Sequence, residues 1–127
     1  MLKGSGMAIG TVLVVDDDPA IVELVETALQ DQGYQVLSAV NGAALQLARE
    51  RQPDVILLDI LMPGMDGVEV SQRLRADPLT ARIPIIAMSA QDRLRATSSL
   101  MPVNDRLAKP FRLTGLYTTV ARWAPAP

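Results

Sequence analysis

The 127-residue sequence contains no cysteine and no histidine. Without cysteine the chain cannot form disulfides, thiolate nucleophiles or sulfur-ligated metal centres. Without histidine it lacks the commonest general base, the usual transition-metal ligand and every Ser–His arrangement. Any chemistry must therefore depend on carboxylates, hydroxyls and lysine, a set that suits a hard cation such as magnesium or calcium.

Long apolar runs are also missing, and so is an excess of charge of one sign. No stretch approaches the roughly 18 apolar residues that span a bilayer. The net charge of −2 gives no general attraction to nucleic acid or to an anionic membrane. We therefore expect a cytoplasmic protein that binds neither nucleic acid nor membrane directly.

Short apolar runs alternate with segments of helical periodicity along the chain. They predict strands at 11–15, 34–40, 54–58, 84–88 and 106–108, and helices at 19–32, 41–51, 67–76, 91–100 and 113–123. Asp18 and Pro19 are typical of a helix start, and Gly33 of a helix end. Apolar strands separated by amphipathic helices indicate a parallel sheet covered on both faces. We predict an α/β fold, a doubly wound five-stranded parallel sheet of the flavodoxin-like order 2-1-3-4-5.

The domain is expected to span residues 8–124. Residues 1–7 lack the apolar core of a signal peptide and are interpreted as a vector-derived remnant. Residues 125–127 are interpreted as a tail or the start of a linker.

Four of the predicted strands lead into side chains that can bind phosphate or metal. These are Asp16 and Asp17, Asp59, Ser89 and Lys109. In a parallel sheet all these strand ends lie at the same edge, so the side chains should meet in one shallow pocket. Carboxylates so close together cannot all stay ionised without a cation, and magnesium fits because it takes one or two protein carboxylates. The metal and Lys109 could then neutralise a phosphoryl group that moves onto Asp59 while Ser89 donates a hydrogen bond to it.

Each of these residues alone has a simpler explanation. An aspartate after an apolar strand is usually a helix cap or a turn former, a serine is usually a cap, and a lysine is usually solvated. Their joint occurrence at successive strand ends favours a functional site. A P-loop nucleotide site is excluded, because the chain has no Gly-x-x-x-x-Gly-Lys-Ser/Thr segment.

At these residues the sequence resembles the receiver domains of bacterial response regulators, the CheY-like family of two-component signal transduction. The matching segments are Val-Leu-Val-Val-Asp-Asp-Asp-Pro at 12–19, Leu-Leu-Asp-Ile-Leu-Met-Pro-Gly-Met-Asp-Gly at 57–67, Ile-Ile-Ala-Met-Ser-Ala at 85–90 and Leu-Ala-Lys-Pro-Phe at 107–111. The resemblance implies that Asp59 accepts phosphate from a histidine kinase or a histidine phosphotransfer protein. It also implies that Asp17, Asp59 and the Leu61 carbonyl bind Mg²⁺ directly, and that Asp16 acts through a metal-bound water.

The resemblance assigns roles to other residues as well. Lys109 would pair with the phosphoryl group, and Ser89 would follow it and move a loop. The peptide bond before Pro110 would be cis, and Gly64 and Gly67 would serve the turn after the acceptor. The family implies a monomer or a weak homodimer, and the downstream partner is not defined by these residues.

Two departures from the family pattern affect the switch. Arg106 stands where the family usually has tyrosine or phenylalanine, and residues 101–105 replace the usual Gly-Ala-Asp approach to the last strand. We hypothesise that the output depends on backbone movement of residues 89–106, or on Arg106 moving between solvent and an acidic partner. Unchanged phosphorylation-dependent partner binding in Arg106→Ala would exclude the second version.

Three alternatives remain at the level of sequence. A receiver-like interaction module without phosphorylation should have lost an acidic residue or the lysine, and none is lost. A Mg²⁺-dependent phosphatase with an aspartyl-phosphate intermediate should have a second aspartate two positions after the nucleophile, where Leu61 stands. A flavodoxin-like electron carrier should have stacking aromatics, yet only 3% of the residues are aromatic. We therefore expect a phosphoacceptor that is not a turnover enzyme on an external substrate.

Overall fold

A five-stranded parallel sheet forms the centre of the computed structural model, which describes residues 9–40, 42–60, 67–97 and 100–125. The strands in these ranges are β1 (Thr11–Val15), β2 (Gln35–Ala39), β3 (Val55–Asp59), β4 (Ile85–Ala90) and β5 (Asp105–Lys109). The helices are α1 (Pro19–Asp31), α2 (Ala43–Arg51), α3 (Gly67–Ala76), α4 (Gln91–Thr97) and α5 (Leu113–Trp123). The strand order is β2-β1-β3-β4-β5, which confirms the predicted doubly wound topology.

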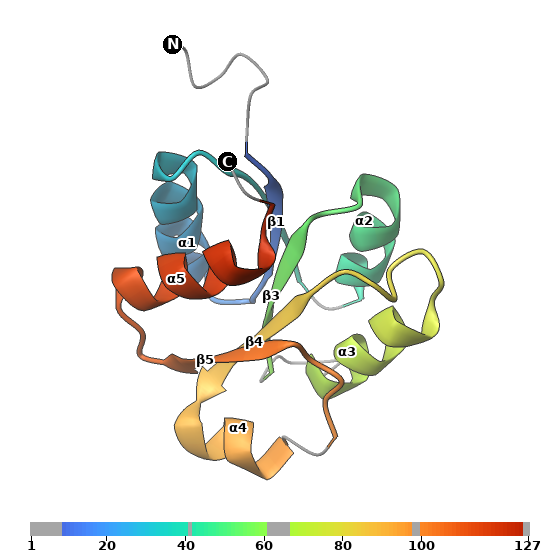
Figure 1. The fold of residues 1–127 in the computed structure, drawn as a ribbon. Coiled ribbons are helices and arrows are strands. Elements are labelled where there is room, and N and C mark those ends of the chain that lie inside the picture. Colours follow the sequence, from blue (N-terminus) through green and yellow to red (C-terminus); the bar gives the residue numbers. More distant parts are fainter. Residues whose placement is uncertain (1–8, 41, 61–66, 98–99, 126–127) are drawn as a thin grey trace.

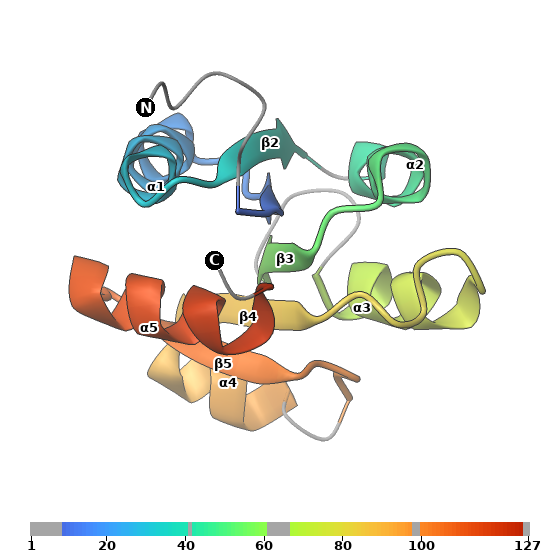
Figure 2. The same cartoon turned by 45° about the horizontal axis from the view of Figure 1, so that its top comes forward.

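Helices cover both faces of the sheet (Figure 1). α1 and α5 lie together on one face, and α2 and α3 lie on the other, as the tilted view of Figure 2 shows. Strand alternation explains the two layers, since Val12 and Val14 pack with α1 and α5 whereas Leu13 and Val15 pack with α2 and α3. None of the helices in the described part of the chain has the length and apolar character needed to span a bilayer.

The carboxyl ends of β4 and β5 extend further than the apolar pattern predicts. Ser89 and Lys109 are paired members of these strands, since Ser89 lies opposite Ala108 and Lys109 lies opposite Ala90. Strand ends are set by backbone pairing, which apolar periodicity does not detect. α4 is described over Gln91–Thr97, and Leu100, the predicted last residue of this helix, lies in a turn.

The chain leaves the carboxyl end of β1 through a capped helix start. The side chain of Asp18 accepts a hydrogen bond from the backbone N–H of Ala20 at 3.0 Å, and Pro19 occupies the first turn. Gly33 has a φ of 100°, which is the left-handed conformation that ends a helix and favours glycine. The Asp18 cap thus starts α1 directly after Asp16 and Asp17 in the sequence, close to the end of β1.

Candidate functional site

The predicted reactive side chains meet at the carboxyl edge of the central strands. Asp59, the last residue of β3, lies opposite Met88, the neighbour of Ser89. Lys109, the last residue of β5, lies opposite Ala90. Because the strands are parallel and in register, all three functional groups come to one edge of the sheet.

Three carboxylates form a compact acidic cluster there. One oxygen each of Asp16, Asp17 and Asp59 lies within 4.8 Å of the others. Asp16 and Asp59 are buried, whereas Asp17 is exposed. Such crowding favours a bound cation, because like charges at this separation repel one another. Carboxylate oxygens are the ligands of hard divalent cations, so the donor set fits a metal of that kind.

Lys109 places a positive charge against this cluster. Its Nζ lies 2.9 Å from Oδ2 of Asp16 and 3.7 Å from Oδ2 of Asp59. The Lys109 side chain is about a quarter exposed, so its ammonium lies between the buried carboxylates and solvent. It can therefore neutralise negative charge that arrives from outside at Asp59.

Asp16 and Asp17 differ in how their carboxylates are held. Oδ2 of Asp16 accepts a hydrogen bond from the Lys109 ammonium, and Oδ1 of Asp16 accepts one from the backbone N–H of Asp18 at 2.9 Å. Asp16 is thus engaged through both of its oxygens, and Asp17 presents its carboxylate at the surface. Asp17 is the better placed of the two to bind a metal ion directly.

Ser89 lies on β4, the neighbour of β3, and Arg106 lies on β5, one strand further out. Ser89 is buried near the end of β4, one residue before the exposed Ala90. Arg106 lies opposite Ala87 and is exposed. Since its neighbour Leu107 packs with α1 and α5, Arg106 belongs to the other face of β5, the one covered by α4.

Gly67, the first residue of α3, lies directly against the end of β3. A Cβ at Gly67 would lie 2.6 Å from Cα of Ile60 and closer still to the carbonyl oxygen of Asp59, so only glycine fits there. Its N–H donates to the carbonyl of Ile60 at 2.9 Å, which ties the start of α3 to the end of β3. Leu61 and Gly64, to which the family resemblance also assigned roles, lie outside the described residues. The Lys109–Pro110 peptide bond is cis.

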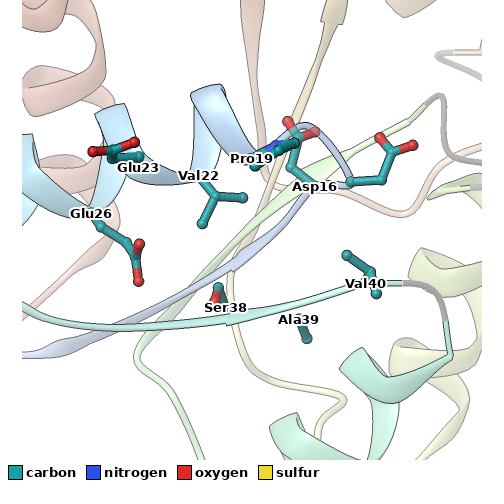
Figure 3. A pocket seen from close by; sticks show the side chains of 9 residues that line it. Asp16, Pro19, Val22, Glu23, Glu26, Ser38, Ala39 and Val40 are labelled. Carbon is teal, nitrogen blue, oxygen red and sulfur yellow. The ribbon is translucent and has the colours of Figure 1, made fainter.

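A groove that the sequence did not reveal opens beside the acidic cluster. Its volume is about 450 Å³, and it is lined by Asp16, Asp17, Pro19, Val22, Glu23, Glu26, Ser38, Ala39 and Val40. Figure 3 shows Val22 and Glu26 pointing from α1 toward β2. The groove therefore continues the acidic surface from Asp16 and Asp17 to Glu23 and Glu26 of α1.

The doubly wound parallel sheet, with its carboxylates and lysine at one edge, is that of a CheY-like α/β protein. Residues 12–121 match the family model described as the response regulator receiver domain. The chain belongs to the response regulator receiver family.

Relatives of this family align over most of the chain. The chain is 45% identical over 105 residues to the DNA-binding dual master transcriptional regulator RpaA of Synechocystis sp., covering 79% of this chain and 43% of RpaA. It is 35% identical over 112 residues to protein PilH of Pseudomonas aeruginosa, covering 86% of this chain and 93% of PilH. The chain spans less than half the length of several curated relatives, RpaA among them.

A solved receiver structure superimposes closely on this chain. It is the receiver domain of a sensor histidine kinase from Pseudomonas aeruginosa PAO1, with a magnesium ion coordinated in its active-site cleft. The TM-score is 0.84 at 32% identity, and the match covers 90% of this chain and 96% of that one.

Proposed function

We propose that this chain is the phosphoacceptor receiver of a two-component system. Asp59 takes a phosphoryl group from the phosphohistidine of a histidine kinase or a histidine phosphotransfer protein, and the aspartyl phosphate changes binding to a downstream partner. The observation that carries the proposal is the Lys109 ammonium, 2.9 Å from Asp16 and 3.7 Å from Asp59. A buried carboxylate with a cationic side chain beside it is a suitable acceptor for an anionic group.

The transfer needs only an in-line displacement. An oxygen of Asp59 attacks phosphorus, the N–P bond to the donor imidazole breaks with its electron pair staying on nitrogen, and an acyl phosphate forms. Lys109 pairs with a phosphoryl oxygen as charge gathers there, and the hydroxyl of Ser89 donates a hydrogen bond to another. Ser89 thereby senses whether Asp59 carries phosphate.

The acidic cluster is proposed to hold Mg²⁺. Asp17 and Asp59 would bind it directly, Asp16 would act through a water, and the Leu61 carbonyl would be a further ligand. The bound ion supplies charge neutralisation for the phosphoryl oxygens. The donor set of three carboxylates within 4.8 Å supports this assignment, as does the magnesium ion in the related receiver domain.

The proposal also covers the bounds of the domain, its location and its partners. Residues 8–124 are proposed as the receiver domain, which the family match over 12–121 supports. The chain would act in the cytoplasm, as a monomer or weak homodimer, without direct contact to nucleic acid or membrane. It would not turn over an external substrate, and its output would depend on a partner protein or domain.

Incubation with acetyl phosphate and Mg²⁺, followed by intact mass measurement, tests the proposal. We expect one labile phosphate adduct that is absent in Asp59→Asn and absent when Mg²⁺ is chelated. Asp18→Asn is the matched control, because it removes a neighbouring charge and asparagine still caps α1. An adduct that persists in Asp59→Asn, or no adduct on the parent chain, would overturn the proposal.

A further inference from the structure

We infer that Arg75 is a positioning residue for phosphoryl transfer, because with Asn104 it clamps together the starts of the two strands that end at Ser89 and Lys109. The inference rests on the proposed function, since those two residues act there on the phosphoryl group. Arg75 itself lies at the other end of the sheet, in the last turn of α3.

The Arg75 guanidinium holds two separate segments of backbone. On the segment that enters β4, its Nη1 donates to the carbonyls of Ala81 at 3.1 Å and Ile83 at 2.7 Å. On the segment that enters β5, its Nε donates to the carbonyl of Pro102 at 3.0 Å, and its Nη2 donates to Oδ1 of Asn104. The guanidinium therefore bridges two segments that are far apart in the sequence. They lead into β4 and β5, which are neighbours in the sheet (Figure 1).

Asn104 completes the clamp by pairing with the first residue of β4. Its Oδ1 accepts the Ile85 N–H at 2.9 Å, and its own N–H donates to the Ile85 carbonyl at 2.8 Å. The next pair along the ladder is Ile86 with Asp105, so the Ile85–Asn104 pair fixes the register of β5 against β4. A shift in that register would move Lys109 relative to Ser89, because both lie at the far ends of the same ladder.

The clamp is also tied to the acceptor strand. The N–H of Gly67, at the start of α3, donates a hydrogen bond to the carbonyl of Ile60, the residue that follows Asp59. Arg75 lies in the last turn of the same helix. Gln72 of α3 adds a hydrogen bond to the carbonyl of Leu100 at 3.1 Å. α3 thus links the acceptor on β3 to the entrances of β4 and β5.

The surroundings of Arg75 favour arginine over lysine at this position. The hydrogen-bond acceptors of Arg75 among the described residues are neutral oxygens, and burial lowers the pKa of its guanidinium. A planar fork can reach four acceptors in two segments, whereas the single ammonium of lysine cannot. Arg75→Lys should therefore keep the charge and lose the clamp.

The test separates metal binding from phosphoryl transfer. The carboxylates proposed to hold the metal directly follow β1 or end β3, whereas Ser89 and Lys109 lie on the clamped strands β4 and β5. In Arg75→Lys and Asn104→Ala we expect the rate of labelling by acetyl phosphate at saturating Mg²⁺ to fall on the order of tenfold, because small misplacements of reacting groups are costly. Mg²⁺ affinity, measured by calorimetry, should not weaken, and hydrogen exchange in 105–109 should become faster.

Asn104→Asp is the conservative control. Its carboxylate keeps both the acceptor for the Ile85 N–H and the acceptor for Arg75, so the labelling rate should return to within about twofold of the parent. If Arg75→Lys fails to fold, the comparison of Asn104→Ala with Asn104→Asp decides the question.

Three outcomes would overturn the inference. They are unchanged labelling in both clamp variants, weakened Mg²⁺ binding in parallel with slower labelling, or no recovery in Asn104→Asp. Failure of the proposed function is seen separately, as the absence of an Asp59 adduct on the parent chain, and that result would remove both.

Discussion

At the scale of single residues, Lys109 determines the electrostatics of the site. Its ammonium contacts Asp16 and lies near Asp59, two buried carboxylates that would otherwise repel each other. The same positive charge repels a bound cation. On the proposed function, Lys109 should therefore favour an incoming phosphoryl group and oppose metal binding.

Replacement of Lys109 should change these two properties in opposite directions. In Lys109→Gln we expect slower labelling by acetyl phosphate and tighter Mg²⁺ binding. Two unit charges about 4 Å apart interact by roughly 1 kcal/mol even in water, which corresponds to about fivefold in affinity, and the double charge of Mg²⁺ increases the gain at a given distance. Calorimetric titration with Mg²⁺ measures the gain. Arg112→Gln, an equal charge change at an exposed residue, should leave Mg²⁺ affinity unchanged, and weaker Mg²⁺ binding in Lys109→Gln would contradict this account.

At the scale of the elements, one carboxylate joins α5 to β5. Oδ2 of Asp105 accepts the indole N–H of Trp123 at 2.9 Å and forms an ion pair with Arg122. Burial raises the pKa of the Asp105 carboxyl, whereas hydrogen bonds from Trp123 and from the backbone of Arg106 lower it. Arg122 lowers it further by a hydrogen bond and by its charge, so the pKa lies below its ordinary value of 3.8.

The lowered pKa of Asp105 predicts a pH-dependent contribution to stability. A group whose pKa is lower in the folded state stabilises the fold above its ordinary value, and the contribution is lost as the pH falls through the folded pKa. Parent and Asp105→Asn should therefore differ most in free energy of unfolding at about pH 5, and the difference should shrink toward about pH 3. Urea unfolding followed by the fluorescence of Trp123, the single tryptophan, measures this. A difference that stays constant over this range would exclude the ionised Asp105 as its source.

At the scale of the whole molecule, the acidic cluster destabilises a fold that is otherwise well packed. Apolar clusters on both faces of the sheet hold the strands in place, and the strands in turn hold three carboxylates within 4.8 Å. The packing of the core thus opposes the mutual repulsion of the carboxylates. A cation that relieves the repulsion should stabilise the entire domain.

Mg²⁺ should therefore raise the free energy of unfolding of the parent chain. For a ligand that binds only the folded state, the gain is about 2.7 kcal/mol at a hundred times the dissociation constant. Denaturant unfolding with and without Mg²⁺ measures it, and a chelator should reverse it. In Asp17→Asn the gain at the same Mg²⁺ concentration should be smaller, whereas Asp18→Asn should respond like the parent. An equal gain in Asp17→Asn would show that the ion binds elsewhere.

The sequence by itself determined the elements and most of the candidate site. Strand and helix periods, and the Asp18–Pro19 helix start, are short-range features, so they predicted the alternating α/β pattern. Asp59 and Lys109 could be predicted as site residues because each follows an apolar strand in a fold where such ends meet. The positions of the strand ends were predicted less accurately, because backbone pairing extends β4 and β5 beyond their apolar runs.

Only the tertiary structure decided how distant side chains pair. Arg75 and Asn104 are separated by 29 positions, and Lys109 and Asp16 by 93. Periodicity reports which face of an element a residue occupies, but not which residue of another element it meets. That choice follows from strand order and register, which are set by the packing of the whole sheet, so the clamp on β4 and β5 could be seen only once the fold was assembled.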